Sequence, residues 1–215
     1  MRFRYAIFDM DGTLLDSIPY WDRLVPEFLE QLGIQNAEGL NDRMSAMSIQ
    51  EACIWLKDMF SLNETAEEIT RKLCEKIGRN YAEDIQLKPG VKEWLFYLKE
   101  QGVHMCLATA SSAELGRPAL ERNGILSCFD FLVDCGMAGA WKTSPAVYHL
   151  AAERFGASVE DCVVVEDALF ALKTAKKAGF LTIGVYEKSE PDQEEVRYFS
   201  DRYVKHYDEL MGILD

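Results

Sequence analysis

Five short runs of apolar residues set the fold class of this 215-residue chain. Each run is continuous rather than alternating, which is typical of strands covered on both faces of a parallel sheet. Helix-length segments with one apolar stripe separate most of the runs, and several of these segments end at a glycine. The alternation predicts an α/β fold, a doubly wound parallel sheet with a Rossmann-like core. The predicted strands are Tyr5–Phe8, Val103–Ala108, Phe131–Val133, Cys162–Val165 and Leu181–Val185.

One segment of the chain breaks this alternation. Residues 16–88, between the first two predicted strands, hold several helical stripes and no convincing strand. Pro89-Gly90 follows and is typical of a turn back into the first domain. The predicted organisation is an α/β core domain that carries the catalytic site, over 1–15 and 89–215, with an inserted all-helical cap domain over 16–88.

The first predicted strand runs directly into a pair of carboxylates. Asp9 and Asp11 flank Met10, and Gly12 follows, which permits a tight turn. Ligands of open α/β sheets bind beyond the carboxyl ends of the strands, so this pair stands where a site is expected. Two nearby carboxylates repel each other unless a cation or a shared proton intervenes, and Mg²⁺ prefers such oxygen ligands. The alternative is an Asx-type turn that simply ends the strand.

Three further groups of polar residues occupy comparable positions in the pattern. They are Thr109-Ala110-Ser111 after the second strand, Lys142 before a helix, and Glu166-Asp167 after the fourth strand. The first group offers hydroxyl and backbone N–H groups to a phosphate. Taken singly, each group has an ordinary explanation: an N-cap cluster, a solvated lysine, or acids at a helix N-terminus. Four such groups in one order predict a phosphate and metal site at one edge of the sheet.

Charge and cysteine usage limit the partners and the location. Acidic residues number 36 against 23 basic ones, and the net charge of −13 argues against nucleic acid or an anionic membrane as partner. An anionic substrate stays compatible, because a metal and a few cations set the local field. The six cysteines form no Cys-x-x-Cys pair and mostly lie in apolar runs, which indicates reduced core thiols.

The remaining composition points to the cytoplasm. No apolar run reaches the roughly 18 residues of a membrane span. An acidic residue directly follows the first apolar run, which is unlike a signal peptide. We therefore expect a cytoplasmic protein that is a monomer or a weak dimer. The acidic stretch Glu187–Glu195 is expected to be a solvated loop.

The order of these motifs resembles that of the haloacid dehalogenase-like hydrolase superfamily, in the branch of phosphatases and β-phosphoglucomutases with a helical cap. The resemblance covers nearly the whole chain, and its first motif is the most specific. The matching segments are Asp9–Ser17, Ala108–Ser112, Lys142–Pro145 and Val164–Asp167 with Ala178-Gly179. The chain departs from the family at Thr143 and Ala146, where Pro and Asp are common, and at Ala168 and Ala171, where Ser and Gly are common. None of these departures removes a primary reactive group.

The resemblance implies a role for the two carboxylates of the first motif. Asp9 would attack phosphorus and form an aspartyl-phosphate, which divides one difficult displacement into two. Asp11 would protonate the leaving oxygen and then deprotonate the attacking water. In the family, haloacid dehalogenases lack this second acid, because a halide leaving group needs no proton. The presence of Asp11 therefore favours phosphoryl transfer.

The resemblance also implies the binding groups. The transferring phosphoryl group would be held by Thr109, Ala110 and Lys142, of which Thr109 and Lys142 also stabilise the developing charge. Mg²⁺ would be held by Asp9, the backbone carbonyl of Asp11, Asp167 and Glu166, and would lessen the repulsion between the nucleophile and an anionic substrate. The predicted activity is that of a phosphoric monoester hydrolase acting on a small phosphorylated metabolite.

The cap is expected to select the substrate by closing over the site. Among its residues we select Arg43, because a cation before the next helix could meet a substrate anion. The other candidates, each explained equally well as cap core or surface, are Tyr20, Trp21, Met44 and Ser45. Two alternative functions stay open. A sugar-phosphate mutase of the β-phosphoglucomutase type would need cap cations for a second phosphate. A non-catalytic phosphometabolite-binding protein would bind without turnover.

Overall fold

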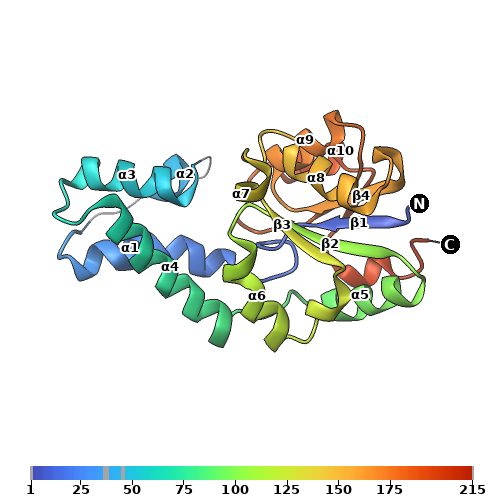
Figure 1. Cartoon of the computed structure of the whole chain (residues 1–215), viewed down its shortest axis with the longest axis horizontal. Helices are drawn as coiled ribbons and strands as arrows, with labels where there is room; N and C mark the ends of the chain where they lie inside the picture. Colours follow the sequence, from blue (N-terminus) through green and yellow to red (C-terminus); the bar gives the residue numbers. More distant parts are fainter. Residues whose placement is uncertain (1, 36–38, 45–46, 215) are drawn as a thin grey trace. The chain divides into compact units, whose positions relative to one another are not determined.

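The computed structural model describes residues 2–35, 39–44 and 47–214, and the chain divides into two compact units (Figure 1). The first unit comprises Met1–Asp16 and Gln86–Asp215, and the second comprises Ser17–Ile85. Asp16 and residues 86–88, which the sequence assigned to the inserted domain, therefore group with the first unit. That the two units act as catalytic core and cap stays a prediction.

A six-stranded parallel sheet forms the centre of the first unit, in the order β3-β2-β1-β4-β5-β6 (Figure 1). Phe8, the last residue of β1, pairs with Leu107 of β2 on one side and with Val165 of β4 on the other. The carboxyl ends of these three strands therefore meet at one edge of the sheet. The strands are β1 (Tyr5–Phe8), β2 (His104–Thr109), β3 (Phe131–Asp134), β4 (Cys162–Glu166), β5 (Leu181–Val185) and β6 (Arg202–Val204).

The predicted doubly wound parallel sheet is confirmed, with one strand more than the sequence indicated. The additional strand, β6, is only three residues long and lies at the edge of the sheet with its first residue exposed. Its three residues are Arg202, Tyr203 and Val204, of which only Val204 is buried, so its sequence carries no continuous apolar run.

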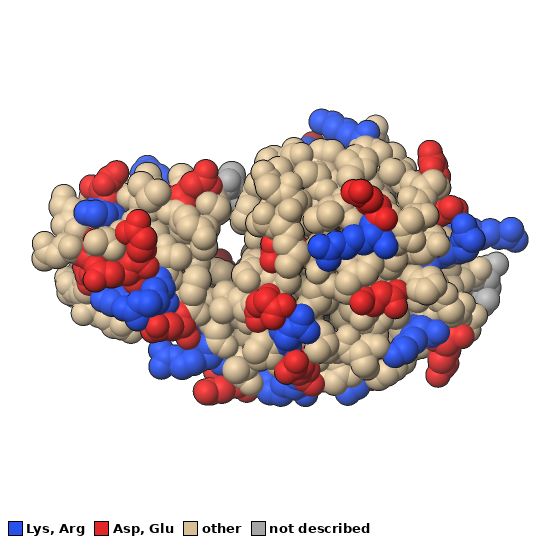
Figure 2. Space-filling view, viewed as in Figure 1, with Lys and Arg blue, Asp and Glu red and all other residues tan. Residues whose placement is uncertain are grey.

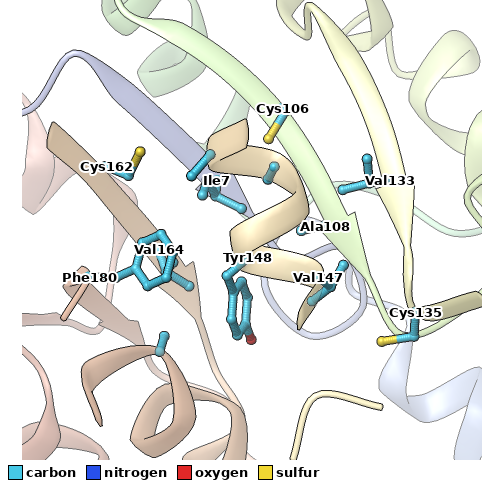
Figure 3. Close-up of a cluster of buried hydrophobic side chains, with 13 residues drawn as sticks. Ile7, Cys106, Ala108, Val133, Cys135, Val147, Tyr148, Cys162, Val164 and Phe180 are labelled. Carbon is cyan, nitrogen blue, oxygen red and sulfur yellow. The ribbon is translucent and has the colours of Figure 1, made fainter. Parts of the chain in front are cut away.

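Helices cover both faces of this sheet, with α8 and α9 on one face and α5 and α6 on the other (Figure 1). Ile7 and Phe8 are adjacent in β1, so their side chains point to opposite faces of the sheet, and both are fully buried. Ile7 joins a cluster with Tyr148 of α8 (Figure 3), whereas Phe8 meets Trp94 of α5 edge to face, with 5.4 Å between the ring centroids. Burial on both faces explains the continuous apolar runs. The helices are α5 (Val91–Glu100), α6 (Ala113–Arg122), α7 (Cys135–Ala138), α8 (Ala146–Phe155), α9 (Leu169–Lys177) and α10 (Gln193–Phe199).

Among the described residues of the second unit, all regular secondary structure is helical, as predicted. Its helices are α1 (Ile18–Gln31), α2 (Leu40–Met44), α3 (Ile49–Phe60) and α4 (Ala66–Glu83). Capping boxes begin α3 and α4: Ser48 pairs reciprocally with Glu51, and Thr65 with Glu68. The apolar stripes of α1, α3 and α4 bury their side chains against one another, so the unit has its own small core.

Two composition-based expectations can be compared with the structure. All six cysteines are described, and all are free, five of them buried; Cys106, Cys135 and Cys162 lie among the core side chains in Figure 3. Among the described residues, none of the helices is both long and apolar enough to cross a membrane. Lys, Arg, Asp and Glu are interspersed over the visible face of the first unit (Figure 2), so the negative charge is not gathered into one patch there.

Candidate active site

The loop after β1 places Asp9 and Asp11 at the carboxyl edge of the sheet. The backbone N–H of Asp9 donates to the carbonyl of Val165 at 3.0 Å, so the pairing of β1 with β4 continues one residue beyond the strand. Gly12 then takes a left-handed conformation with φ of +83°, which a glycine adopts without strain. The N–H groups of Leu14 and Leu15 both donate to the carbonyl of Met10 and close the loop. The Asp9 carboxylate is buried at this point, with 6% of the residue exposed.

Three buried carboxylates gather at this edge. Oxygen atoms of Asp9, Glu166 and Asp167 lie within 4.8 Å of one another. Lys142 joins the cluster from the segment before α8: its Nζ contacts Asp9 Oδ1 and lies 2.5 Å from Glu166 Oε1. Lys142 is 2% exposed, so this ion-paired group is shielded from water. The structure thus brings together four of the residues that the sequence singled out.

Two hydroxyl groups complete the surroundings of the cluster. Thr13 Oγ1 donates to Asp167 Oδ1 at 2.7 Å, and the phenol of Tyr148 donates to Glu166 Oε1 at 2.9 Å. Sequence reasoning missed both roles. Thr13 lies inside the first motif and could have been suspected, but Tyr148 belongs to the apolar stripe of a helix and carries no local signal.

The charges of the cluster are unbalanced, because three carboxylates face one ammonium group. Burial raises the pKa of Glu166 to about 7, and the charge of Asp9 adds to the rise while Lys142 opposes it. Burial, Asp9 and Glu166 raise the pKa of Asp167 well above its usual value. Burial alone would lower the pKa of Lys142, but the charges of Asp9 and Glu166 raise it overall, so this side chain stays protonated.

This excess of buried negative charge fits a divalent cation. The donors are carboxylate oxygens, which suit a hard ion better than one that prefers nitrogen or sulfur. The thiol of Cys135 has its pKa raised to about 11 by burial, with the charge of Lys142 opposing the rise, so it is protonated and a poor ligand. The residues present therefore fit a metal site of oxygen donors at Asp9, Glu166 and Asp167.

Asp11 is held from the neighbouring strand. Ser111 Oγ donates to Asp11 Oδ2 at 2.8 Å, and the Ser111 N–H donates to Thr109 Oγ1 at 3.1 Å. Thr109 is fully buried at the end of β2, with Ala110 next to it at the start of the turn into α6. Two of the predicted phosphate-binding residues, Thr109 and Ala110, therefore lie at the end of β2, the strand that pairs with β1. Sequence reasoning counted Ser111 among the hydroxyl groups of this turn without assigning it to Asp11.

A further carboxylate fixes the elements on this side of the site. Asp134, at the end of β3, accepts from the N–H of Ala113 at 3.1 Å and from the N–H of Met137 at 2.9 Å. One side chain thus anchors the N-termini of α6 and α7 to the sheet. Its strand reads as three apolar residues followed by an acid, and we had not singled that acid out.

The candidates of the inserted segment are found in the second unit. Arg43 lies in α2 with an exposed side chain, and Met44 beside it is partly buried. Trp21 donates through Nε1 to the phenol of Tyr81 at 3.2 Å, and Tyr20 stacks beneath the guanidinium of its neighbour Arg23. Both aromatic residues thus have partners inside their own unit. The last candidate, Ser45, lies outside the described residues.

Comparisons with known proteins agree with this arrangement. A family model for haloacid dehalogenase-like hydrolases matches residues 3–179. A phosphorylated carbohydrates phosphatase from Thermotoga maritima is 28% identical over 174 residues, 81% of this chain and 81% of that protein. A β-phosphoglucomutase from Bacillus subtilis is 27% identical over 190 residues, 84% of this chain and 82% of that protein. The crystal structure of CbbY from Rhodobacter sphaeroides in complex with phosphate is similar with a TM-score of 0.82 and 25% identity, covering 97% of this chain and 96% of that one.

Proposed function

Because the chain belongs to the haloacid dehalogenase-like hydrolase family, we propose that it is a Mg²⁺-dependent phosphatase of a small phosphorylated carbohydrate, with Asp9 as nucleophile. The family and its phosphatase-named relatives confirm the coarser prediction of a phosphoric monoester hydrolase. The observation that carries the proposal is the buried cluster of Asp9, Glu166, Asp167 and Lys142 beyond the central strands.

In the first step a carboxylate oxygen of Asp9 attacks phosphorus. A P–O bond forms to Asp9 while the ester P–O bond breaks, and Asp11 gives its proton to the departing alcohol oxygen. The ion pair with Lys142 holds the Asp9 carboxylate in one orientation, which lowers the entropic cost of reaching the transition state. The aspartyl-phosphate is the product of this step.

In the second step water attacks the aspartyl-phosphate. Asp11, now ionised, takes the proton of the attacking water, and the bond between phosphorus and Asp9 breaks to release inorganic phosphate. Asp9 returns as a carboxylate and Asp11 as an acid, so the cycle closes. The hydrogen bond from Ser111 keeps Asp11 at one place through both steps, which its two roles require.

The phosphoryl oxygens need positive charge and hydrogen-bond donors. A lysine ammonium has three N–H groups, of which two are directed to Asp9 and Glu166, so one is left for a phosphoryl oxygen. Thr109 and the N–H of Ala110 at the adjacent turn are the other donors that we assign to the phosphate. Developing charge at phosphorus is thereby met by groups that are already in position.

We assign the metal to the carboxylates of Asp9 and Asp167, with the backbone carbonyl of Asp11 and with Glu166 completing the cluster. Mg²⁺ bound there would supply positive charge that lessens the repulsion between Asp9 and an anionic substrate. Thr13 orients Asp167 for metal binding by its hydrogen bond, as residues that contact metal ligands commonly do.

The substrate class follows from the relatives, several of which are named as phosphatases of carbohydrate or hexitol phosphates. We assign substrate selection to the helical unit, with Arg43 as the first residue to vary. We also keep the view that the protein acts in the cytoplasm, as a monomer or weak dimer, on a small metabolite and not on nucleic acid or a membrane.

The experiment that tests the proposal is a phosphate-release screen with phosphorylated metabolites and Mg²⁺, followed by the Asp9→Asn variant on the best substrate. Loss of the nucleophile should reduce turnover by several orders of magnitude, while circular dichroism confirms that the variant is folded. A folded variant that retains activity within about tenfold of wild type would exclude Asp9 as the nucleophile. No turnover by the wild-type protein on any phosphate would favour the non-catalytic binding protein.

A mutase is the second candidate, favoured by the likeness to the β-phosphoglucomutase of Bacillus subtilis. It would form the same aspartyl-phosphate but return the phosphoryl group to the sugar. The last part of the predicted insert, residues 77–88, contains two cations, Arg79 and Lys88. Lys88 is paired with Glu187 within the first unit, which leaves Arg79 for a second phosphate. We therefore expect that β-glucose 1-phosphate with a bisphosphate primer gives free phosphate at least as fast as it gives glucose 6-phosphate. Phosphorus NMR follows both products. Isomer in large excess would establish the mutase.

A further inference from the structure

Most of the acidic segment Glu187–Glu195 is exposed, as its composition indicated, but its first residue is not, and α10 begins within it at Gln193. Glu187 is buried, and its Oε2 lies 2.6 Å from Nζ of Lys88. The N–H and hydroxyl of Ser189 both donate to Glu187 Oε1 at 3.2 Å. The side-chain amide of Gln193 donates to the carbonyls of Glu187 and Glu190 at 2.8 and 2.9 Å. Three of these contacts, one from Lys88 and two from Gln193, join residues 187–190 to other parts of the first unit.

The same segment reaches the helix that follows Asp167. Glu190 Oε2 accepts from the backbone N–H of Leu169 at 3.0 Å, and its Oε1 accepts from the N–H of Asp192 at 3.1 Å. Leu169 is the first residue of α9 and lies two positions after Asp167. The N-cap residue of α9 is Ala168, which has no side-chain oxygen to bind the N–H groups of the first turn. Glu190 supplies that oxygen from 21 residues away.

Packing joins the same two regions. Leu169 and Leu172 of α9 form a buried cluster with Val196 of α10, the helix that begins at Gln193 within the acidic segment. The acidic segment thus contacts the start of α9, directly after Asp167, through a hydrogen bond from Glu190 and through apolar packing.

We propose that Glu190 is a positioning residue for Asp167. Its side chain caps the N-terminus of α9, a role that Ala168 at the N-cap position cannot fill. The carboxylate fixes the Leu169 N–H and, through two peptide units, the direction of Asp167 toward Asp9 and Glu166. A carboxylate is suited to this place, since the N-terminus of a helix carries partial positive charge. The inference rests on the metal site of the proposed function.

The test is calorimetric titration of Mg²⁺ alone into wild type, Glu190→Ala and Glu194→Ala. Groups that orient metal ligands typically contribute 10–100-fold to affinity, and we expect the dissociation constant of Mg²⁺ to rise about tenfold in Glu190→Ala. Glu194 is the matched control, because it is an exposed carboxylate in the first turn of α10, four residues away. Glu194→Ala should stay within about twofold of wild type.

The outcomes separate the inference from the function on which it rests. Mg²⁺ affinity of Glu190→Ala equal to that of the control would overturn the role of Glu190 while leaving the metal site intact. Absence of saturable Mg²⁺ binding by the wild type would overturn the metal site, and the inference with it. If Glu190→Ala does not fold, Glu190→Gln decides. Glutamine is uncharged and has one side-chain oxygen for the N–H groups of Leu169 and Asp192, so the affinity of this variant for Mg²⁺ should fall measurably. Wild-type affinity in Glu190→Gln would then reject the proposal.

Discussion

The Sδ and Cε atoms of Met10 lie against the backbone of Gly116, both 2.4 Å from the position that a Cβ at Gly116 would occupy. Met10 is the residue between Asp9 and Asp11, and it is fully buried. Gly116 lies within α6, so the absence of a side chain there allows the helix to pack directly on the loop that carries the two aspartates.

Gly116→Ala should therefore impair catalysis more than it impairs stability. Alanine gains about 1 kcal/mol of helix propensity over glycine. Overpacking a buried contact costs about 1–3 kcal/mol, so the free energy of unfolding should fall by about 1 kcal/mol. Displacement of Met10 moves its neighbours Asp9 and Asp11, and we expect kcat to fall at least about tenfold. Chemical denaturation and steady-state kinetics measure the two effects.

A double-mutant comparison shows whether Met10 is the cause. In a Met10→Ala background the clash is gone and the gain in helix propensity remains, so Gly116→Ala should be neutral or stabilising there. If Gly116→Ala costs the same free energy of unfolding in both backgrounds, the contact with Met10 does not explain its effect.

Removing the Ser111 hydroxyl should slow the hydrolysis of phosphates with poor leaving groups more than that of phosphates with good ones. Ser111 orients Asp11 by a 2.8 Å hydrogen bond, and an alkyl alkoxide needs the proton of Asp11 far more than a nitrophenolate does. For Ser111→Ala we expect kcat to fall about tenfold or more on an alkyl phosphate and only slightly on p-nitrophenyl phosphate. Ser111→Thr, which keeps the hydroxyl, should recover most of the loss. An equal fall on both substrates would mean that Ser111 has a general structural role instead.

Chelation should remove activity, and Mg²⁺ should restore it. The cluster of Asp9, Glu166 and Asp167 offers only oxygen donors, which suit Mg²⁺. Ca²⁺ should restore little activity, because its looser and higher coordination misplaces the attacking oxygen. Phosphate release after treatment with EDTA and re-addition of each ion is the measurement, with elemental analysis to verify removal. Full activity of a metal-free protein would contradict this site.

The stabilisation that Mg²⁺ provides should increase with pH. Burial raises the pKa of Glu166 from 4.5 to about 7, so the folded protein favours the neutral carboxyl group. The resulting contribution to the free energy of unfolding is fully present below about pH 4.5 and is lost as the pH rises through about 7. The metal-free protein should therefore melt at a lower temperature at about pH 7.5 than at about pH 5.5, and Mg²⁺, which binds ionised carboxylates, should raise Tm more at the higher pH.

Thermal scans at the two pH values, with and without Mg²⁺, measure these differences. Glu166→Gln is the control: without the titrating group, the metal-free protein should lose less stability over this range of pH. A Mg²⁺-induced rise in Tm that is the same at both values would show that the ion does not compete with protons at the cluster.

The sequence by itself determined the strands and the order of the reactive groups. A strand buried on both faces needs a continuous apolar run, and this local requirement is visible at Tyr5–Phe8 and Cys162–Val165 without any tertiary information. Asp9 and Glu166-Asp167 stand directly at the ends of these runs, so strand geometry alone assigns them to the carboxyl edge of the sheet. The short strand β6 buries only Val204 of its three residues, so it lacks such a run and could not be predicted in this way.

Only the tertiary structure decided which groups touch. Lys142 meets Asp9 across 133 residues of chain. Thr13 meets Asp167 across 154 residues, because β4 pairs with β1. Strand order is set by packing over the whole sheet, and no local pattern encodes it. For the same reason the sequence could not distinguish Glu190, which caps the helix after Asp167, from the exposed carboxylates around it. Local patterns reflect the burial of single elements, whereas the partner of a polar side chain depends on how distant elements fold against one another.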